Sequence, residues 1–356
     1  MKKKLVIINQ SQFGYHSDTY YYCKYLRSSF NITYICWDYS KKKIKLRGIT
    51  VIYISRSGNL VVRNLRFIFQ VIKELKKGYH FHFIKYFRGC SIIKLIYMKK
   101  KFIVDIRSGS IKNKKIDRFM YDFLMKMETK PFEYVSVISK SLAQKNDLPQ
   151  KTYILPLGAD IISTSKKNFD SIKLLYVGTL ENRNIADTII GFSKFYHEYK
   201  EKINILYTIV GSGHRTEEKE LKELVQSEKI GAAVEIKGQI PHDEIHCFFD
   251  SNNIGVSYIP KTEYFNLQPP TKTFEYLLSG MPVIATDTLE NKAVIHNGNG
   301  ILINDTSDSF YNGLVQIYEN KNKYDSNSIR SASMGYTWKK IVRDLNLKIH
   351  FFMNET

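Results

Sequence analysis

The 356-residue chain has only four cysteines, eight prolines and two tryptophans, and it contains no long apolar run. The cysteines form no Cys-x-x-Cys pair and no zinc-ligand spacing, which argues against a disulfide-stapled or zinc-ribbon domain and favours a reducing compartment. They are Cys23, Cys36, Cys90 and Cys247. The apolar run at residues 5–8 is too short for a signal peptide or a membrane span. We therefore expect a cytoplasmic protein whose contact with a membrane is peripheral.

Acidic residues are also in the minority, because 34 Asp and Glu face 54 Lys and Arg, giving a net charge of +20. Such an excess indicates an anionic partner, namely nucleic acid, acidic lipid or a phosphorylated small molecule, or simply a basic proteome. The hydrophobic content of 43% is too high for a disordered chain. The length predicts two domains.

Short β-branched runs alternate with helical patterns along most of the chain, which predicts α/β domains with parallel sheets covered on both faces. The predicted strands lie at residues 5–8, 32–36, 50–54, 80–84, 102–104, 135–138, 174–177, 205–210, 234–236, 254–256, 282–285 and 301–303. A polar segment at 161–170 indicates a linker. We predict two doubly wound, Rossmann-like domains facing across a cleft, with ligands at the carboxyl ends of the strands. The predicted bounds are 1–162 and 170–335, followed by a closing amphipathic helix at 336–356.

The most specific motif spans residues 268–285, where a helix begins at Pro270 or Thr271, ends at Gly280 and precedes a buried strand. A helix N-terminus presents free N–H groups and a partial positive charge, which suit a phosphate. Lys272 adds a full charge in the first turn, and Glu275 could accept hydrogen bonds from ribose hydroxyls. On these residues alone, a surface helix with a solvated lysine and glutamate is an equally good interpretation.

Other chemical motifs are missing or weak. No two aspartates are separated by one residue, so an Asp-x-Asp metal site is absent, and there is no phosphate-binding GxxxxGK[ST] loop. Gly211 and Gly213 form only part of a dinucleotide-binding pattern. His242 and His246 have the spacing of zinc ligands but no evident third ligand. We expect neither a metal ion nor a cofactor.

The motif at 268–285 resembles the donor-site motif of the retaining glycosyltransferases of family 4, which have the GT-B fold. Further segments are similar to the same family, in the same order along the chain. They are residues 175–180, 209–213, 234–242 and 336–338, and in the first half residues 105–110 and 154–160, which resemble bacterial polysaccharide-assembly members.

The resemblance implies roles for single residues. Arg183 and Lys272 would face the donor diphosphate as catalytic residues, and Glu275 would bind the ribose. The remaining implied positions are Gly178, Thr179, Gly211, Gly213 and Thr271 for the donor, Gly14, Asp105 and Glu263 for the acceptor or cleft, and Arg107 at about the place of the family's catalytic histidine. The chain departs from the family pattern at Leu267, where a first glutamate is common, and at Thr179, where arginine is common.

The resemblance also implies the reaction. A sugar of the hexose type would pass with retention from a nucleotide-sugar donor to the acceptor hydroxyl, which attacks on the face that the diphosphate leaves. Such a reaction needs positioning and charge stabilisation rather than a covalent nucleophile or a metal ion. The implied setting is bacterial surface polysaccharide synthesis, with a glycan linked to polyprenol diphosphate as the acceptor.

Residues 112–130 predict a basic amphipathic helix with apolar residues on one face. That face could be core, or it could lie on an anionic membrane. We predict a peripheral protein on the inner face of the cytoplasmic membrane. A non-catalytic, glycosyltransferase-like binding subunit is the alternative function. A nucleic-acid-binding protein is less favoured, because no nucleic-acid-binding module is recognisable.

Overall fold

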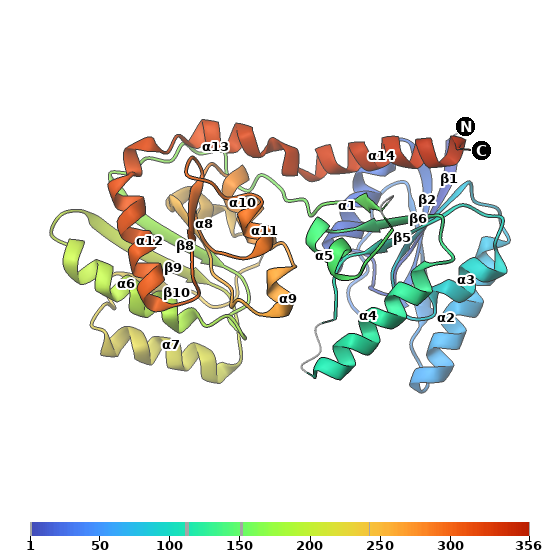
Figure 1. Ribbon diagram of the computed structural model, residues 1–356, viewed down its shortest axis with the longest axis horizontal. Coiled ribbons are helices and arrows are strands. Elements are labelled where there is room, and N and C mark those ends of the chain that lie inside the picture. The colour runs from blue at the N-terminus through green and yellow to red at the C-terminus, as the bar shows by residue number, and fades with distance from the viewer. Residues whose placement is uncertain (1, 111–113, 150–151, 242, 356) are drawn as a thin grey trace. The chain divides into compact units, whose positions relative to one another are not determined.

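A computed structural model of the chain describes residues 2–110, 114–149, 152–241 and 243–355. The chain divides into two compact units, each built around one parallel sheet with helices beside it (Figure 1). The first unit comprises residues 1–157 and 338–356, and the second comprises residues 158–337.

The first unit has a seven-stranded parallel sheet. In sheet order its strands are β3 (Ile49–Ser55), β2 (Phe30–Asp38), β1 (Lys3–Ile8), β4 (Phe81–Lys85), β5 (Phe102–Ile106), β6 (Tyr134–Val137) and β7 (Tyr153–Ile154). Its helices are α1 (Ser17–Leu26), α2 (Leu60–Leu75), α3 (Cys90–Ile96), α4 (Lys115–Thr129), α5 (Lys140–Lys145) and α14 (Trp338–Asn354). The central strands β1 and β5 are fully buried from residue 5 to residue 8 and from 102 to 106, as expected for a sheet with two covered faces, and Asp105 is the one polar residue in these two stretches.

The last helix, α14, belongs to the first unit although it follows the second unit in sequence. The Trp338 ring stacks on Tyr21 of α1 at a centroid distance of 5.0 Å. At the other end of the helix, the ring of Phe352 stacks on Tyr134 of β6 at 3.8 Å. The apolar face that the sequence indicated is therefore buried against α1 and the sheet.

The second unit has a six-stranded parallel sheet. In sheet order its strands are β10 (Val234–Ile236), β9 (Asn204–Val210), β8 (Ser171–Val177), β11 (Ile254–Ser257), β12 (Val283–Thr286) and β13 (Gly300–Ile303). Its helices are α6 (Ile185–Tyr199), α7 (Arg215–Ser227), α8 (His246–Ser251), α9 (Glu263–Asn266), α10 (Thr271–Leu278), α11 (Leu289–Lys292), α12 (Ser307–Glu319) and α13 (Ser326–Ser333), with the short 3-10 turns η1 (Lys321–Lys323) and η2 (Met334–Tyr336).

Helix α10 ends where the sequence predicted, at Gly280. The amide of Gly280 donates to the carbonyl of Leu277, and the amide of Met281 donates to the carbonyl of Tyr276. This pair of bonds is the Schellman ending, which requires the left-handed backbone that Gly280 adopts at a φ of 73°. The ending turns the chain directly into the buried strand β12.

The polar segment at 161–170 lies within the second unit and is not a free linker between the units. Ser163 is 3% exposed, and its hydroxyl donates to Asp250 at 2.5 Å. Lys167 is also buried, and its ammonium donates to the carbonyl of Phe249. The polar side chains that suggested solvent exposure are instead bonded to protein groups.

Candidate active site

Two glycine-containing loops follow the neighbouring strands β8 and β9. Gly178, the first residue after β8, has a φ of 151°. A Cβ atom added at Gly211, the first residue after β9, would lie 1.8 Å from the carbonyl oxygen of Gly178, so the two backbones touch. A Cβ at Gly213 would lie 2.3 Å from Oε2 of Glu217. Only glycine permits this approach at the carboxyl ends of the strands, where doubly wound sheets bind ligands.

The N-terminus of helix α10 has no side-chain cap, and Pro270 occupies the N-cap position. The first N–H groups of a helix have no intrahelical partner, and they carry the positive end of the helix dipole. Thr271, the first helical residue, is exposed. The helix therefore begins with accessible donors and a partial positive charge.

Lys272 projects from this first turn toward the glycine loops. A Cβ at Gly178 would lie 3.0 Å from the Lys272 ammonium nitrogen, and that nitrogen lies 3.7 Å from the ring centroid of Tyr176. The nitrogen is buried and has no hydrogen-bond partner among the described residues. Burial first, and then the charge of Arg183, lower the pKa of Lys272 to about 7, while Glu275 opposes the shift. A buried ammonium without an acceptor is costly, and an anionic ligand would remove that cost.

Glu275 lies three residues after Lys272, one turn further along α10 and on the same side of the helix. Its side chain is partly exposed. Burial raises the pKa of Glu275 to about 7, against the effect of Lys272 and with a smaller contribution from Asp160. The Glu275 carboxyl and the Lys272 ammonium therefore both have a pKa close to physiological pH.

Arg183 lies in the turn between β8 and α6, flanked by Asn182 and Asn184, whose φ values are 55° and 52°. Asparagine accepts this left-handed backbone better than most residues. The guanidinium lies 4.3 Å from the ring centroid of Phe265 on α9 and bonds to the carbonyl of Asn182 at 3.2 Å. Aromatic stacking and the turn hold its charge near the Lys272 ammonium.

The other predicted residues of this unit lie nearby in sequence or at its surface. Thr179 is exposed, and its carbonyl accepts a hydrogen bond from the Tyr176 hydroxyl at 2.6 Å. Glu263 is the exposed first residue of α9, and Leu267 caps the end of the same helix. The position at which the family resemblance would place a first glutamate therefore lies at a helix end and carries an apolar side chain.

Arg107 is the centre of a buried polar cluster in the first unit. It is 5% exposed, and its Nε donates to Asp18 of α1 at 2.5 Å. Its Nη1 donates to the carbonyl of Leu155 at 2.6 Å. Asp105 is fully buried, accepts a bond from the Ser136 hydroxyl at 2.7 Å, and has its pKa raised to about 6 by burial. This arginine, found where the family would have a histidine, is held in the core.

The loop after β1 contains Gly14 and His16, and His16 lies near Asp18 and Arg107 of this cluster. Gly14 has a φ of 88°, and a Cβ there would lie 2.3 Å from the side chain of Ile44. His16 is the N-cap of α1, and its Nδ1 accepts the amide of Thr19 at 3.4 Å. Burial, and next the charge of Lys85, lower the pKa of His16 to about 4. The imidazole is therefore neutral, and its proton lies on Nε2.

The structure thus brings Gly178, Arg183, Lys272 and Glu275 together in the second unit, whereas Gly14, Asp105 and Arg107 lie in the first unit. Sequence reasoning missed Tyr176, Asp18, His16 and Lys85. Tyr176 lies in β8 two residues before Gly178, so the alternation of side chains along the strand could have pointed to it. No local pattern signals Asp18, because its partner Arg107 is distant in sequence. His242 lies outside the described residues, and His246 bonds to the carbonyl of Asp243 at 2.9 Å.

Comparisons with known proteins give one sequence match and many structural ones. The family described as glycosyl transferases group 1 matches residues 171–320. No curated protein shows a significant match to the chain. The sucrose-phosphate synthase of Thermosynechococcus elongatus has a similar structure, with a TM-score of 0.77 at 14% identity, covering 99% of this chain and 100% of that one.

Two further solved structures are similar over nearly the whole chain. Anabaena HepE in complex with UDP gives a TM-score of 0.79 at 12% identity, over 98% of this chain and 100% of that one. The lipopolysaccharide outer core galactosyltransferase WaaB in its apo form gives 0.72 at 15% identity, over 98% and 99%. These likenesses confirm the predicted GT-B fold, with two Rossmann-like units. The matched domain on this fold makes the protein a glycosyltransferase.

Proposed function

We propose that this glycosyltransferase uses a nucleotide sugar whose diphosphate binds between the glycine loops and the first turn of α10. The observation that carries the proposal is the buried, unpartnered ammonium of Lys272 beside Gly178. The diphosphate would accept bonds from that ammonium and from free helix amides, and Arg183 would add charge. Glu275 would accept hydrogen bonds from the ribose hydroxyls. The HepE structures hold UDP and UDP-glucose, so a UDP-sugar is the first donor to test.

The proposed chemistry is transfer with retention and without a metal ion. As the bond to the sugar breaks, negative charge grows on the leaving phosphates, and preorganised cations stabilise it without a reorganisation cost. Lys272, Arg183 and the α10 amides supply this charge. The acceptor hydroxyl would attack on the face that the diphosphate leaves, so that holding both substrates in place is the remaining task.

The proposed acceptor is a glycan linked to polyprenol diphosphate in bacterial surface polysaccharide synthesis. Such a carrier stays in the bilayer, so the enzyme would work as a peripheral protein on the inner face of the cytoplasmic membrane. Among the described residues, no helix is both long and apolar enough to cross a membrane. The contact would instead be made by surface helices of the first unit.

Helix α4 supports this location, because its apolar face is not covered. Six apolar side chains of α4 are between 38% and 68% exposed, and only Met125 and Thr129 of this helix are buried. The exposed set is Ile116, Phe119, Met120, Phe123, Leu124 and Met127. Lys114, Lys115 and Arg118 lie in or beside its first turns, while Lys112 falls outside the described residues.

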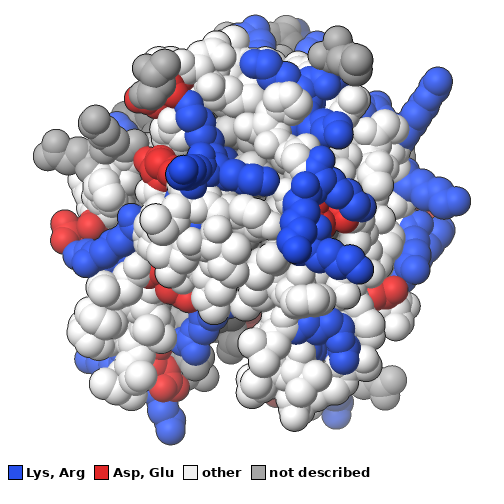
Figure 2. Space-filling view, turned by 90° about the vertical axis from the view of Figure 1, so that its right-hand side faces the viewer, with Lys and Arg blue, Asp and Glu red and all other residues white. Residues whose placement is uncertain are grey.

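The neighbouring helices extend the exposed apolar area. Helix α3 contacts both α2 and α4, so that the three form a continuous group in the first unit. We call their exposed apolar residues, together with those of α4, the α2–α4 surface; they are Leu60, Val61, Val62, Leu65 and Phe69 of α2 and Ile92, Leu95 and Ile96 of α3. Lys and Arg side chains also outnumber Asp and Glu on the face drawn in Figure 2. Exposed apolar area with basic neighbours fits an anionic lipid surface.

The test of the proposed activity uses the purified full chain and a panel of nucleotide sugars. Thermal stabilisation and release of free nucleotide are measured, with and without excess EDTA. We expect at least one donor to stabilise the protein and to be turned over equally well in EDTA. A panel with no response would contradict the proposed donor site, and turnover lost in EDTA but restored by manganese would contradict the metal-free mechanism.

A further inference from the structure

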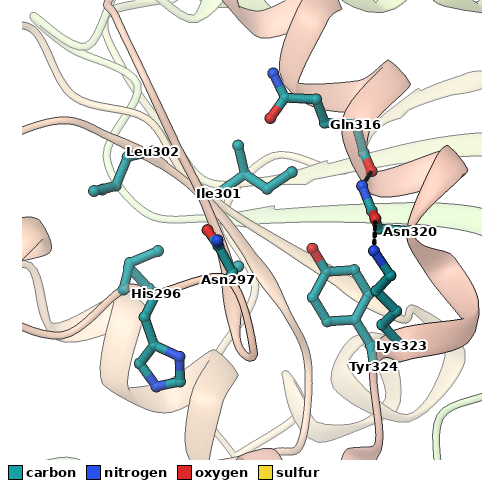
Figure 3. Close-up of a pocket in the computed structure, with 10 residues that line it drawn as sticks. His296, Asn297, Ile301, Leu302, Gln316, Asn320, Lys323 and Tyr324 are labelled. Atoms are coloured by element: carbon teal, nitrogen blue, oxygen red, sulfur yellow. Dashed lines mark hydrogen bonds between the residues drawn. The ribbon is translucent and has the colours of Figure 1, made fainter.

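The second unit has a cavity of about 370 Å³ that shares no residue with the donor site (Figure 3). It lies between the last strand of the sheet, β13, and the end of helix α12 with the turn η1. We call it the β13 pocket. Its volume falls within the range of about 300–1,000 Å³ that is usual for small-molecule sites. His296 and Asn297 line it just before β13 begins, at the amino end of the strand, whereas the donor site lies at carboxyl ends.

Tyr324 provides the first sign of a ligand. Its side chain is 7% exposed, and no hydrogen bond joins its hydroxyl to any described residue. In Figure 3 the hydroxyl points across the cavity toward the strand, on the side where Asn297 lies. Most of the side chain is packed against protein while the hydroxyl oxygen stays accessible, so the hydroxyl can bond to a partner that enters the pocket.

Three side-chain amides also line the pocket. Asn320 is held in place, because its Nδ2 donates to the carbonyl of Gln316 at 2.8 Å and its Oδ1 accepts from Lys323 at 2.6 Å. The amides of Gln316 and Asn297 are exposed and carry no bond to the described residues. Each offers one acceptor and two N–H donors. These side chains therefore present both donors and acceptors to the pocket.

Apolar side chains, among them those of Ile295 and Ile301, also line the pocket. The pocket lining contains no Asp or Glu, and Lys323 is its one full cation. A metal ion or a cationic ligand is therefore disfavoured. A lining that combines apolar side chains with amides and a phenol matches a sugar ring, which has an apolar C–H face and hydroxyl groups around its edge.

An extended peptide adding to the open edge of β13 is the competing occupant. The strand has four residues, and two hydrogen bonds show which of its backbone groups face β12 and which face outward. The carbonyls of Asn299 and Ile303 accept from Val283 and Asp287 on the β12 side, so Gly300 and Leu302 face outward. The amide of Gly300 is already bonded to the carbonyl of His296. Only three backbone groups remain for a peptide, which is a short ladder.

We propose that the β13 pocket binds a sugar residue of the glycan chain that the enzyme extends. This inference rests on the proposed function, because only that function makes a glycan the product of the enzyme. A second glycan site on the donor-binding unit would keep the product near the enzyme between transfers. Its recognition would come from Tyr324, Gln316 and Asn297 together with the apolar side chains of the lining.

The experiment is saturation-transfer NMR on the full-length protein with UDP at saturating concentration, so that the donor site is filled. The probes are glucose, galactose, N-acetylglucosamine, neutral oligosaccharides of each, and a set of extended peptides. We expect oligosaccharide signals that persist under UDP and fall at least about fivefold in the Tyr324→Phe and Gln316→Ala double variant. Tyr311→Phe is the matched control and should bind these sugars as the wild type does. Tyr311 lies on α12, as Gln316 does, but its hydroxyl is bonded to Glu198 outside the pocket.

The results separate this proposal from the proposed function. Absence of any sugar signal under UDP, together with normal UDP binding, would overturn the β13 pocket as a glycan site and leave the donor site standing. Equal binding of single sugars and oligosaccharides would overturn its assignment to a chain. If the wild type gives peptide signals but no sugar signals, and the double variant abolishes the peptide signals, the strand edge binds a peptide instead.

Discussion

Lys272 illustrates how one buried charge can prepare a site for its ligand. The ammonium is desolvated and faces a second cation, Arg183, and both environments disfavour its charged form. The Tyr176 ring, whose centroid lies 3.7 Å away, opposes them in part through a cation–π contact. A bound diphosphate reverses the balance by bringing two negative groups to the same place. The free-energy cost of the unliganded state is thereby recovered on binding.

We expect the affinity for UDP to depend on pH through Lys272. The pKa of about 7 in the free enzyme rises when the diphosphate binds, so affinity should be constant below that pH and fall above it. Between the pKa of Lys272 in the free enzyme and its higher pKa in the complex, the affinity for UDP should fall by up to about tenfold for each pH unit. Calorimetry of UDP binding across this range measures it.

Glu275 also has a pKa of about 7, so a variant is needed to separate the effect of Lys272 on the pH dependence from that of Glu275. Lys272→Arg keeps its charge at every accessible pH and should remove most of the decline. An unchanged pH profile in Lys272→Arg would show that another group is responsible.

Glu275→Ala should weaken UDP binding by about 1–3 kcal/mol, the range for hydrogen bonds to a charged group. The side chain is partly exposed and its pKa is raised by burial, so its removal should leave the melting temperature nearly unchanged. Calorimetry and thermal unfolding of the same preparation give both values. Unchanged affinity would return Glu275 to the role of a solvated helix residue.

Some residues of the proposed donor site can be named from the sequence because their signal is local. Lys272 and Glu275 follow from a helix start that precedes a buried strand, and Gly178 follows from a glycine after a strand. The Tyr176 ring beneath Lys272 and the Asp18 partner of Arg107 come from contacts between elements. Residue types and spacing do not encode such contacts: strand alternation could point to the position of Tyr176 but not to its contact with Lys272, and no local pattern points to Asp18.

Among the structural elements, the glycine loops after β8 and β9 would determine the geometry of the proposed donor site. Gly211→Ala would place a methyl group 1.8 Å from the Gly178 carbonyl oxygen, so the loops must separate. We expect a lower melting temperature and weaker UDP binding in this variant, because the loop that faces Lys272 moves. Differential scanning fluorimetry and calorimetry measure the two effects.

Gly231→Ala is the matched control, because nothing lies within 4 Å of a Cβ atom at that position. It should retain both the stability and the UDP affinity of the wild type. If Gly211→Ala is as well tolerated as Gly231→Ala, the close contact of the two loops has no part in donor binding.

The regular elements were largely predictable, since each predicted strand coincides with a strand of one of the two sheets. Alternating buried runs and amphipathic stretches carry that information within short windows. The segment at 161–170 was mistaken for a linker, because composition does not reveal that Ser163 and Lys167 bond to protein groups. The exposure of the apolar face of α4 could not be predicted for a related reason, because periodicity identifies an apolar face but not what covers it.

For the molecule as a whole, the surplus of basic residues and the α2–α4 surface predict adsorption to anionic membranes. Each Lys or Arg near such a surface contributes on the order of 1 kcal/mol, and the exposed phenylalanines can enter the interface. We expect sedimentation with anionic but not neutral liposomes. The attraction should weaken as the Debye length shrinks from about 10 Å at about 0.1 M salt to about 3 Å at about 1 M.

The variant for this prediction neutralises Lys112, Lys114, Lys115 and Arg118 together. It should release the protein from liposomes while donor binding stays intact. Neutralising Lys219 and Lys222 on α7, which pair with glutamates of their own helix, gives a control in the other unit. A quadruple variant that still pellets would show that this end of α4 does not make the contact, and nucleic-acid binding without liposome binding would favour another partner for the charge.

The most direct test of the donor site is calorimetry of UDP binding to the wild type and to Lys272→Met, a change that keeps the length and packing of the side chain. Lys219→Met, whose side chain is 77% exposed in the wild type, serves as the control. We predict that wild type and control bind UDP equally, and that Lys272→Met binds about 10–100-fold more weakly, as expected for the loss of charged hydrogen bonds. Equal UDP affinity in all three folded proteins would contradict the assignment of the donor diphosphate to this site.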